Sequence, residues 1–168
     1  MTGESSRERT IRIVESQFDL AEVEGVIGHA IRTGDTDALR LLGHGEISIV
    51  LGWPSAAPDV ALKRVPPFRS HAAADGYEAA CARVFDILRA AGVAVWPTTL
   101  HRTQRADGSV VVYHQQPVAD SSTLGTSVLR AAPDGDANTL AMIDAIVRAA
   151  VAVCREGEVG FDVQAANW

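Results

Sequence analysis

Two glycines followed by a serine stand between two apolar runs in the first third of this sequence. Gly43 and Gly45 are separated by one residue, and Ser48 follows. Because glycine has no Cβ, its backbone can approach a ligand closely, and the amides of such a turn can point at phosphate oxygens. The position between two predicted strands argues against a dinucleotide-binding fingerprint and favours a loop that covers phosphates. An ordinary hairpin turn would have the same pattern.

A lysine and a glutamate further along the chain could act as a pair. Lys63 ends the apolar run 60–62, so its ammonium could lie over the α- and β-phosphates of a nucleotide. Glu78 follows fifteen residues later, and it is the only acidic residue between Asp75 and Asp86. Its carboxylate could therefore hold Lys63 in place. The alternatives are a strand-end lysine in solvent and a solvated helix face, which is the commonest position of a lone glutamate.

Asp162 and Asn167 are five residues apart in a polar segment that follows a predicted helix. An aspartate in such a segment can orient an attacking hydroxyl or accept its proton. An asparagine five residues later can ligate magnesium through its amide oxygen. The alternative is a polar loop whose Asp and Asn side chains only form turns.

The elements that would position these groups follow from the hydrophobic periodicity. Residues 1–17 are expected to be a leader, and residues 18–32 an amphipathic helix with Asp19 as N-cap and Glu22 as its capping-box partner. The further expected elements are three short strands in 38–64, a helix over 72–91, strands over 93–102 and 109–116 joined by a turn at 106–108, and a helix over 138–155. This order predicts an α+β fold, in which a five-stranded antiparallel sheet has a helix inserted after its third strand.

Composition restricts the class of protein. The formal net charge is −6 and the sequence has no run of lysine and arginine, so we do not expect a nucleic-acid partner. The polar N-terminus lacks the order of a signal peptide, and no run is expected to reach the ~20 apolar residues of a membrane span. The expected location is therefore cytoplasmic, without a membrane partner. Cys81 and Cys154 lie in apolar helical patterns and are expected to be buried, reduced thiols.

Taken together, these groups resemble the protein-kinase-like superfamily, and in particular small bacterial members such as the aminoglycoside-phosphotransferase-like kinases. Residues 42–50 look like its glycine-rich loop, 60–63 resemble its Val-Ala-x-Lys strand, and Glu78 falls where the partner of that lysine belongs. Residues 110–116 resemble the strand that leads to the hinge beside the adenine. Residues 160–167 are similar to the catalytic loop, including the five-residue step from Asp to Asn. The resemblance covers about residues 38–168.

The resemblance implies ATP and Mg²⁺ as cofactors and a role for each group. Asp162 would be the base, Lys63 would hold the α- and β-phosphates, Glu78 would fix Lys63, and Asn167 would be a magnesium ligand. The residues expected around the nucleotide are Gly43, His44, Gly45, Ser48, Val50, Ala61, Lys63, Gln115, Gln116 and Val118. The implied organisation is a leader over 1–37, a nucleotide-binding small lobe over 38–118, and the start of a helical larger lobe over 119–168.

Several departures from the family pattern weaken the expectation of turnover. Ser48 replaces the third glycine, Gly160 stands where the family has histidine, and Gln164 brings no charge. No Asp-x-Gly segment follows Asn167, so the family's second metal-binding aspartate is missing. The leading hypothesis is a kinase-like protein that transfers phosphoryl to a small-molecule or protein acceptor, in a truncated form in which binding survives better than turnover.

Two other hypotheses stay open. One is a non-catalytic, pseudokinase-type module that binds a nucleotide or a protein without turnover. The other is an unrelated α+β interaction domain. In each case the apolar face of the helix over 138–155 would lack partners, which predicts either a truncated chain or a partner chain that covers this face.

Overall fold

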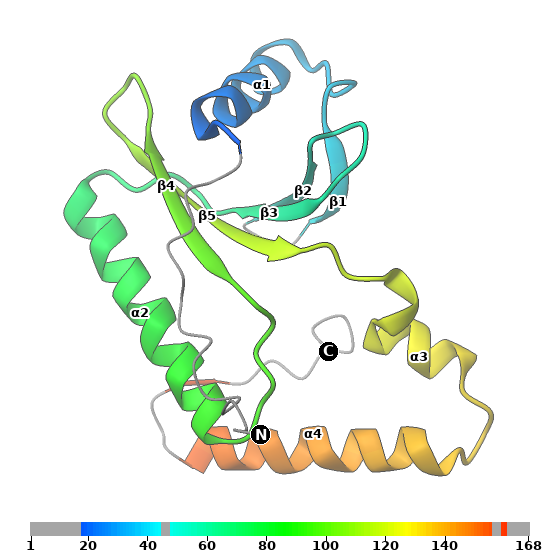
Figure 1. Cartoon of the computed structure of the whole chain (residues 1–168). Helices are drawn as coiled ribbons and strands as arrows, with labels where there is room; N and C mark the ends of the chain where they lie inside the picture. The colour runs from blue at the N-terminus through cyan, green and yellow to red at the C-terminus, as the bar shows by residue number, and fades with distance from the viewer. Residues whose placement is uncertain (1–17, 45–47, 156–158, 161–168) are drawn as a thin grey trace, which may run out of the picture. The chain divides into compact units, whose positions relative to one another are not determined.

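The computed structural model describes residues 18–44, 48–155 and 159–160. The described residues form an α+β structure with one five-stranded antiparallel sheet (Figure 1). The elements in chain order are α1 Leu20–Thr33, β1 Arg40–His44, β2 Ile49–Trp53, β3 Val60–Arg64, α2 His71–Ala90, β4 Thr99–Gln104, β5 Val110–Pro117, the 3₁₀ helix η1 Ser121–Thr123, α3 Gly125–Ala131 and α4 Ala137–Arg155. They confirm the predicted α+β class and the helix after the third strand.

The chain divides into two compact units. The first holds the residues up to Glu78 together with Trp96–Val118, which include α1 and the whole sheet. The second holds Ala79–Val95 and the residues from Ala119 onward, which include the second half of α2 and the helices α3 and α4. Helix α2 therefore contributes to both units.

The strand order in the sheet is β1-β2-β3-β5-β4, and every neighbouring pair is antiparallel. The β4–β5 hairpin closes through a turn in which Gly108 adopts a left-handed φ of 82°. After β3 the chain forms α2 and then enters the sheet again as β4, which is the edge strand. The next strand, β5, lies between β4 and β3. In this register Lys63 lies between Val50 of β2 and His114 of β5.

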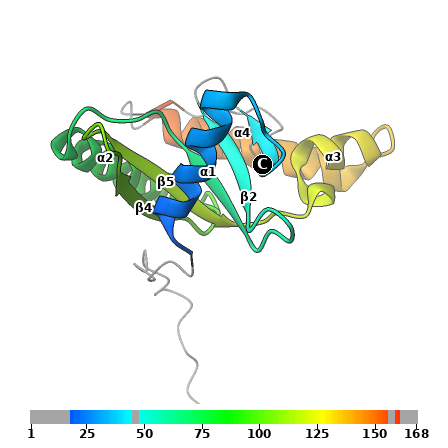
Figure 2. The same ribbon diagram turned by 90° about the horizontal axis from the view of Figure 1, so that it is seen from above.

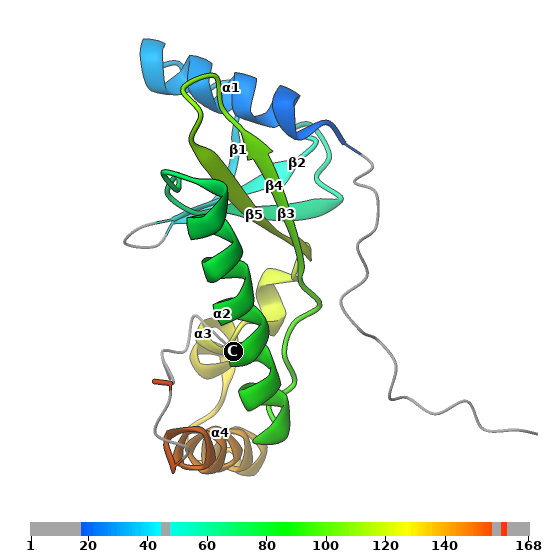
Figure 3. The same cartoon turned by 90° about the vertical axis from the view of Figure 1, so that its left-hand side faces the viewer.

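Helix α1 covers one face of the sheet (Figures 2 and 3). Asp19 begins the helix by accepting a hydrogen bond from the amide of Ala21, and Gly34 ends it in the left-handed conformation. Val23 and Ile27 are at most 2% exposed. They pack against a shared set of buried sheet residues, which are Leu51, Leu62, Val111 and Tyr113. The predicted helix and its N-cap are confirmed.

The first half of α2 packs on the opposite face. Ala74 is fully buried, and Tyr77 and Phe68 lie beside it with their ring centroids 5.1 Å apart. The sheet residues beneath them are Val65, Val110 and Val112. The sheet of the first unit is therefore covered on both faces, which explains why the middle of β5 is a continuous apolar run.

In the second unit, side-chain caps begin two of the helices, η1 and α4. Asp120 accepts a hydrogen bond from the amide of Ser122 at the start of η1, and Asp136 accepts one from the amide of Thr139 at the start of α4. Val153 of α4 is fully buried, whereas Leu140, Val147 and Val151 are about half exposed. The predicted apolar face of α4 is thus divided between buried and exposed positions.

Two expectations require correction. The strand predicted over 93–102 begins only at Thr99, because Pro97 cannot donate to a ladder and the preceding segment runs outside the sheet. Cys154 is exposed and Cys81 is half-buried, whereas both were expected to be buried. Helix α4 is also long and apolar enough to cross a membrane by length and composition alone. A single helix of this kind is weak evidence for a membrane span.

Candidate functional site

The sheet face that α2 partly covers carries four of the ten residues predicted to surround a nucleotide, and Lys63 is one of them. Side chains alternate between the two faces of a strand. Leu51, Leu62 and Tyr113 point to the α1 side. The residues at alternate positions of these strands therefore share the other face, and they include Val50, Ala61, Lys63, His114 and Gln116. Val50, Lys63 and His114 stand in one row across three adjacent strands.

Lys63 is the only lysine of the 168 residues. It lies near the end of β3 and its side chain is exposed, while Ala61 two residues earlier is buried. Within the described part of the chain, Lys63 forms neither an ion pair nor a side-chain hydrogen bond. Lys63 is thus an exposed cation beside apolar strand residues.

His114 is the nearest titratable neighbour of Lys63 across the ladder. Its Nε2 lies 2.8 Å from the hydroxyl of Tyr77, and the two rings meet edge to face. Burial lowers the pKa of His114 to about 4, and the positive charge of Lys63 acts in the same direction. His114 is therefore neutral at pH 7. Lys63 then remains the cationic group in this row.

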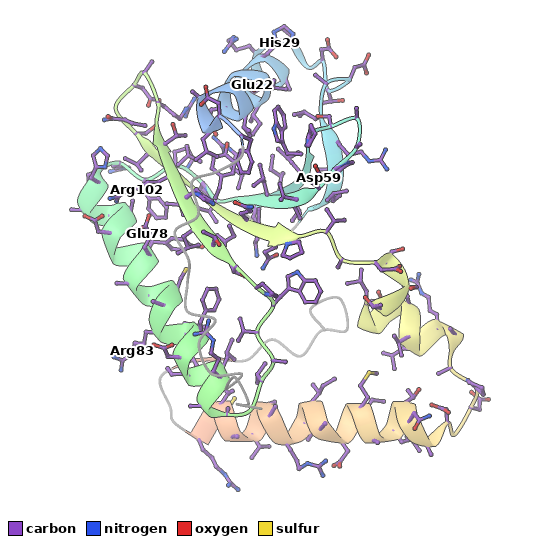
Figure 4. The ribbon with its side chains drawn as sticks, viewed as in Figure 1. Glu22, His29, Asp59, Glu78, Arg83 and Arg102 are labelled. Carbon is purple, nitrogen blue, oxygen red and sulfur yellow. The ribbon has the colours of Figure 1, made fainter. Side chains whose placement is uncertain are left out.

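Glu78 is half-buried on α2, in the same unit as Lys63. No ion pair joins Glu78 to Lys63 among the residues that the structure describes. Figure 4 shows Glu78 on α2 and Arg102 on the neighbouring strand β4. Arg102 donates a hydrogen bond of 2.5 Å to Asp75, which raises the pKa of Arg102, and the charge of Glu78 raises it further. The carboxylate of Glu78 thus acts on Arg102.

The glycine-containing turn joins β1 to β2. Strand β1 has an irregular register between Leu41 and Gly43, and His44 pairs with Ile49. A Cβ built on Gly43 would meet no atom within 4 Å, and the φ of Gly43 is not left-handed. Neither packing nor backbone conformation therefore requires glycine at this position. Ser48 is half-buried just before β2, and Gly45 lies outside the described residues.

The end of β5 carries the three residues predicted to border an adenine. Gln116 donates a hydrogen bond of 2.8 Å to the hydroxyl of Thr98, and Val118 is 40% exposed. Gln115 points to the opposite face, where its Oε1 lies 2.6 Å from Nε2 of His101. The pleat of the strand therefore separates Gln115 from the row of Lys63. Beside Gln116, the indole of the exposed Trp96 donates a hydrogen bond to the carbonyl of Pro117; the sequence had not singled out Trp96.

The predicted base and metal ligand cannot be placed against this face. Asp162 and Asn167 lie outside the described residues, as does Gln164. Within the described residues, no group of three or more His, Cys, Asp or Glu side chains is arranged to hold a metal ion. Among the described residues, this sheet face therefore offers one exposed cation, Lys63, and no cluster of metal ligands.

The sequence analysis did not identify a partly buried ionic network on the α1 face of the sheet. Arg64 donates a hydrogen bond of 2.6 Å to Glu24, and the hydroxyl of Tyr113 donates one of 2.5 Å to the same carboxylate. Both charged side chains are only 11–12% exposed. Glu24 lies four residues after Leu20 and three before Ile27, on the apolar stripe of α1. Its place on the apolar side of α1 could have predicted from the sequence that Glu24 faces the sheet.

The chain was compared with protein-family models, curated protein sequences and solved structures. None of the three comparisons found a match.

Proposed function

We propose that this chain is a kinase-like ATP-binding protein, in which Lys63 binds the phosphates of the nucleotide. The observation that carries the proposal is the environment of Lys63. It is an exposed cation on the sheet face, without an anionic partner among the described residues, beside a histidine that is neutral at pH 7. A lysine on the third strand, followed by a helix that carries a glutamate, is the arrangement with which protein kinases hold the phosphates.

The residues beside Lys63 support a ligand that is polar at one end and flat and apolar at the other. Val50 and Ala61 share its face and offer aliphatic surface, while Gln116 and Val118 lie toward the end of β5. Gly43 adds room for close approach, since no neighbour fills the space of a Cβ there. In this arrangement the base packs toward the end of β5 and the phosphates extend toward Lys63.

The proposal concerns binding more directly than phosphoryl transfer. Transfer to a small-molecule acceptor would need Asp162 as the base and Asn167 as a magnesium ligand, and both lie outside the described residues. Mg²⁺ bound there would neutralise charge on the phosphates. Within the described residues, Lys63 orients the phosphates, and α2 and the sheet keep that face of the protein partly out of water.

The single lysine allows a sharp test. Reductive methylation with ¹³C-formaldehyde labels Lys63 and the terminal α-amine, so the side-chain amines give one NMR signal. We expect ATP to move the Lys63 dimethylamine resonance and to slow the modification of Lys63 by an acylating reagent, measured by intact mass. ATP should also raise the melting temperature, because 100 times the dissociation constant adds about 2.7 kcal/mol of stability.

Two variants control this experiment. Lys63→Ala should abolish the ATP-dependent rise in melting temperature, whereas Arg130→Ala removes an exposed positive charge from α3 and should leave the rise unchanged. An unshifted Lys63 resonance at millimolar ATP, together with an unchanged melting temperature, would rule out the proposed nucleotide site.

A second candidate is a non-catalytic module that binds a nucleotide without turnover. It is favoured by the position of Glu78, which acts on Arg102 and is not paired with Lys63. In active protein kinases the corresponding lysine and glutamate must be paired. This candidate predicts ATP-dependent stabilisation without release of ADP above the buffer rate. Glu78→Gln would then leave ATP binding unchanged, whereas a Lys63–Glu78 pair would make the same variant bind more weakly.

A further inference from the structure

Helix α4 exposes a regular apolar stripe on its outer side. Leu140, Val147 and Val151 are 57%, 54% and 46% exposed, and Cys154 on the same side is also exposed. Successive members are seven, four and three residues apart, which is the spacing of a coiled-coil seam. An exposed stripe of this kind marks a surface that binds another apolar surface.

Two opposite charges stand beside the middle of this stripe. Asp144 and Arg148 form an ion pair one turn apart, and their side chains are 58% and 69% exposed. The helix spans Ala137–Arg155, so its midpoint is residue 146. Asp144 and Arg148 lie two residues before and two residues after that midpoint. A two-fold axis through residue 146 therefore brings Asp144 of one copy opposite Arg148 of another, and the same pair recurs on the other side of the axis.

We propose that α4 is a self-association surface through which two copies of this chain pair in antiparallel orientation, centred on residue 146. The exposed apolar residues then face each other across the axis, with Leu140 of one copy near Val151 of the other. The two Asp144–Arg148 pairs fix the register. The antiparallel arrangement also places the helix dipoles in opposite directions.

The charges of Asp144 and Arg148 favour a second copy of the chain over a lipid bilayer as the surface that covers this stripe. A helix that crossed a membrane, or lay with this stripe in lipid, would take Asp144 and Arg148 away from water into hydrocarbon, which is unfavourable even for a pair. At a protein interface the same two side chains keep both a partner and access to solvent. The helix is about 28 Å long. A single helix pair of this length is a small interface, so we expect a dissociation constant in the micromolar range.

Sedimentation equilibrium of the full chain as a function of concentration measures this association. The 17.8 kDa chain should approach twice that mass as its concentration rises through the micromolar range. Asp144→Arg and Arg148→Asp should each weaken association at least about tenfold, because like charges then meet across the axis.

An equimolar mixture of the two variants should dimerise again. The Asp144→Arg chain carries two arginines at these positions and the Arg148→Asp chain carries two aspartates, so opposite charges meet on both sides of the axis. Neither variant can restore the pair within its own helix, so recovery would come only from contact between copies.

Cross-linking tests the direction of the helices. In the antiparallel pair the two Cys154 residues lie about 24 Å apart, whereas Leu140 of one copy is on the stripe and within about 3 Å, along the helix axis, of the level of Cys154 in the other. With Cys81 replaced by alanine, a short bismaleimide should cross-link Leu140→Cys chains to dimers and leave the parent chain monomeric. A mixture that stays monomeric, variants that dimerise like the wild type, or a wild-type chain that stays monomeric and floats with lipid vesicles would each overturn the proposal.

Discussion

Glu24 is the most constrained acidic side chain of the first unit. Arg64 and Tyr113 both donate hydrogen bonds to it, and the guanidinium of Arg105 lies 3.7 Å from its second oxygen. Burial by itself would raise the pKa of Glu24, but the hydrogen bonds from Arg64 and Tyr113, with the positive charges of both arginines, outweigh it and lower the pKa. Glu24 thus remains ionised between α1 and the sheet.

Replacing Glu24 should destabilise the fold strongly. Glu24→Gln leaves Arg64 buried without its counter-ion, and we expect a loss of about 3 kcal/mol in the free energy of unfolding. Asp37→Asn changes an exposed residue of the same unit and should cost no more than about 0.5 kcal/mol. Urea denaturation of the three proteins checks this. Equal losses in the two variants would show that the network does not hold α1.

A substitution at Gly43 should affect stability and the proposed ATP binding differently. A methyl group there meets no neighbour and the backbone is not left-handed, so Gly43→Ala should leave stability unchanged or raise it by up to about 1 kcal/mol. If the turn approaches phosphates, the same variant should weaken ATP binding about tenfold, which is about 1.4 kcal/mol. Calorimetric titration and urea denaturation measure the two quantities. Undiminished ATP affinity would contradict the role of the turn.

At this scale the sequence predicts the types of side chain better than their partners. Lys63 and His114 become neighbours only through the β3–β5 pairing, which joins residues 51 positions apart, and periodicity carries no register between distant strands. For the same reason Tyr113 appeared as one more apolar strand residue, although it bonds Glu24 across 89 positions. The alternation of side chains along β5 could be predicted from the sequence, and it places Gln115 and Gln116 on opposite faces of the sheet.

At the scale of elements, the contact between Tyr77 and His114 joins α2 to β5. Tyr77 also packs on Phe68, so the first half of the helix is held by apolar contact as well as by the hydrogen bond. Because this face also carries Lys63, the position of α2 affects how close Glu78 can come to the proposed phosphates. The protonation state of His114 is therefore linked to the packing of α2 on the sheet.

Stability should fall as the pH drops from about 6.5 to about 4. The pKa of His114 in the folded protein is about 4, below its ordinary value of 6.5, so the unfolded chain binds the proton first in this window. The contribution is fully present above pH 6.5 and is lost as the pH falls toward 4. His114→Gln should flatten the slope, while His71→Gln, at an exposed position, should retain it. The measurement is the urea midpoint at half-unit pH steps.

Most element boundaries could be predicted because they follow local signals. Asp19 and Gly34 bound α1, and Gly92 follows α2, with φ values of 76° and 82° for the two glycines. The strand start at Thr99 could not be predicted from its apolar neighbours. Residues 93–95 are apolar, but they belong to the second unit and have no strand to pair with.

At the scale of the whole molecule, the chain divides into two units that share α2. The α1 network and both sheet-based core clusters belong to the first unit, while Val153 and the helices α3 and α4 belong to the second. The sequence could not predict that α2 is shared between the two units, because a continuous helical pattern gives no sign of where its contacts change. The α+β class could be predicted, since it depends only on the order of elements.

Hydrogen exchange should reveal whether the two units open independently. Glu24→Gln removes a contact inside the first unit, so amides of α1 and of the strands β3 and β5 should exchange faster, by up to about a hundredfold for a loss near 3 kcal/mol. Amides of α4 should exchange at the wild-type rate, because no residue of the Glu24 network belongs to the second unit. The measurement is peptide-resolved mass spectrometry of both proteins at pH 7. Equal acceleration in α4 would mean that α2 couples the units into one cooperative fold, whereas unchanged exchange in α1 would mean that Glu24 does not secure the helix.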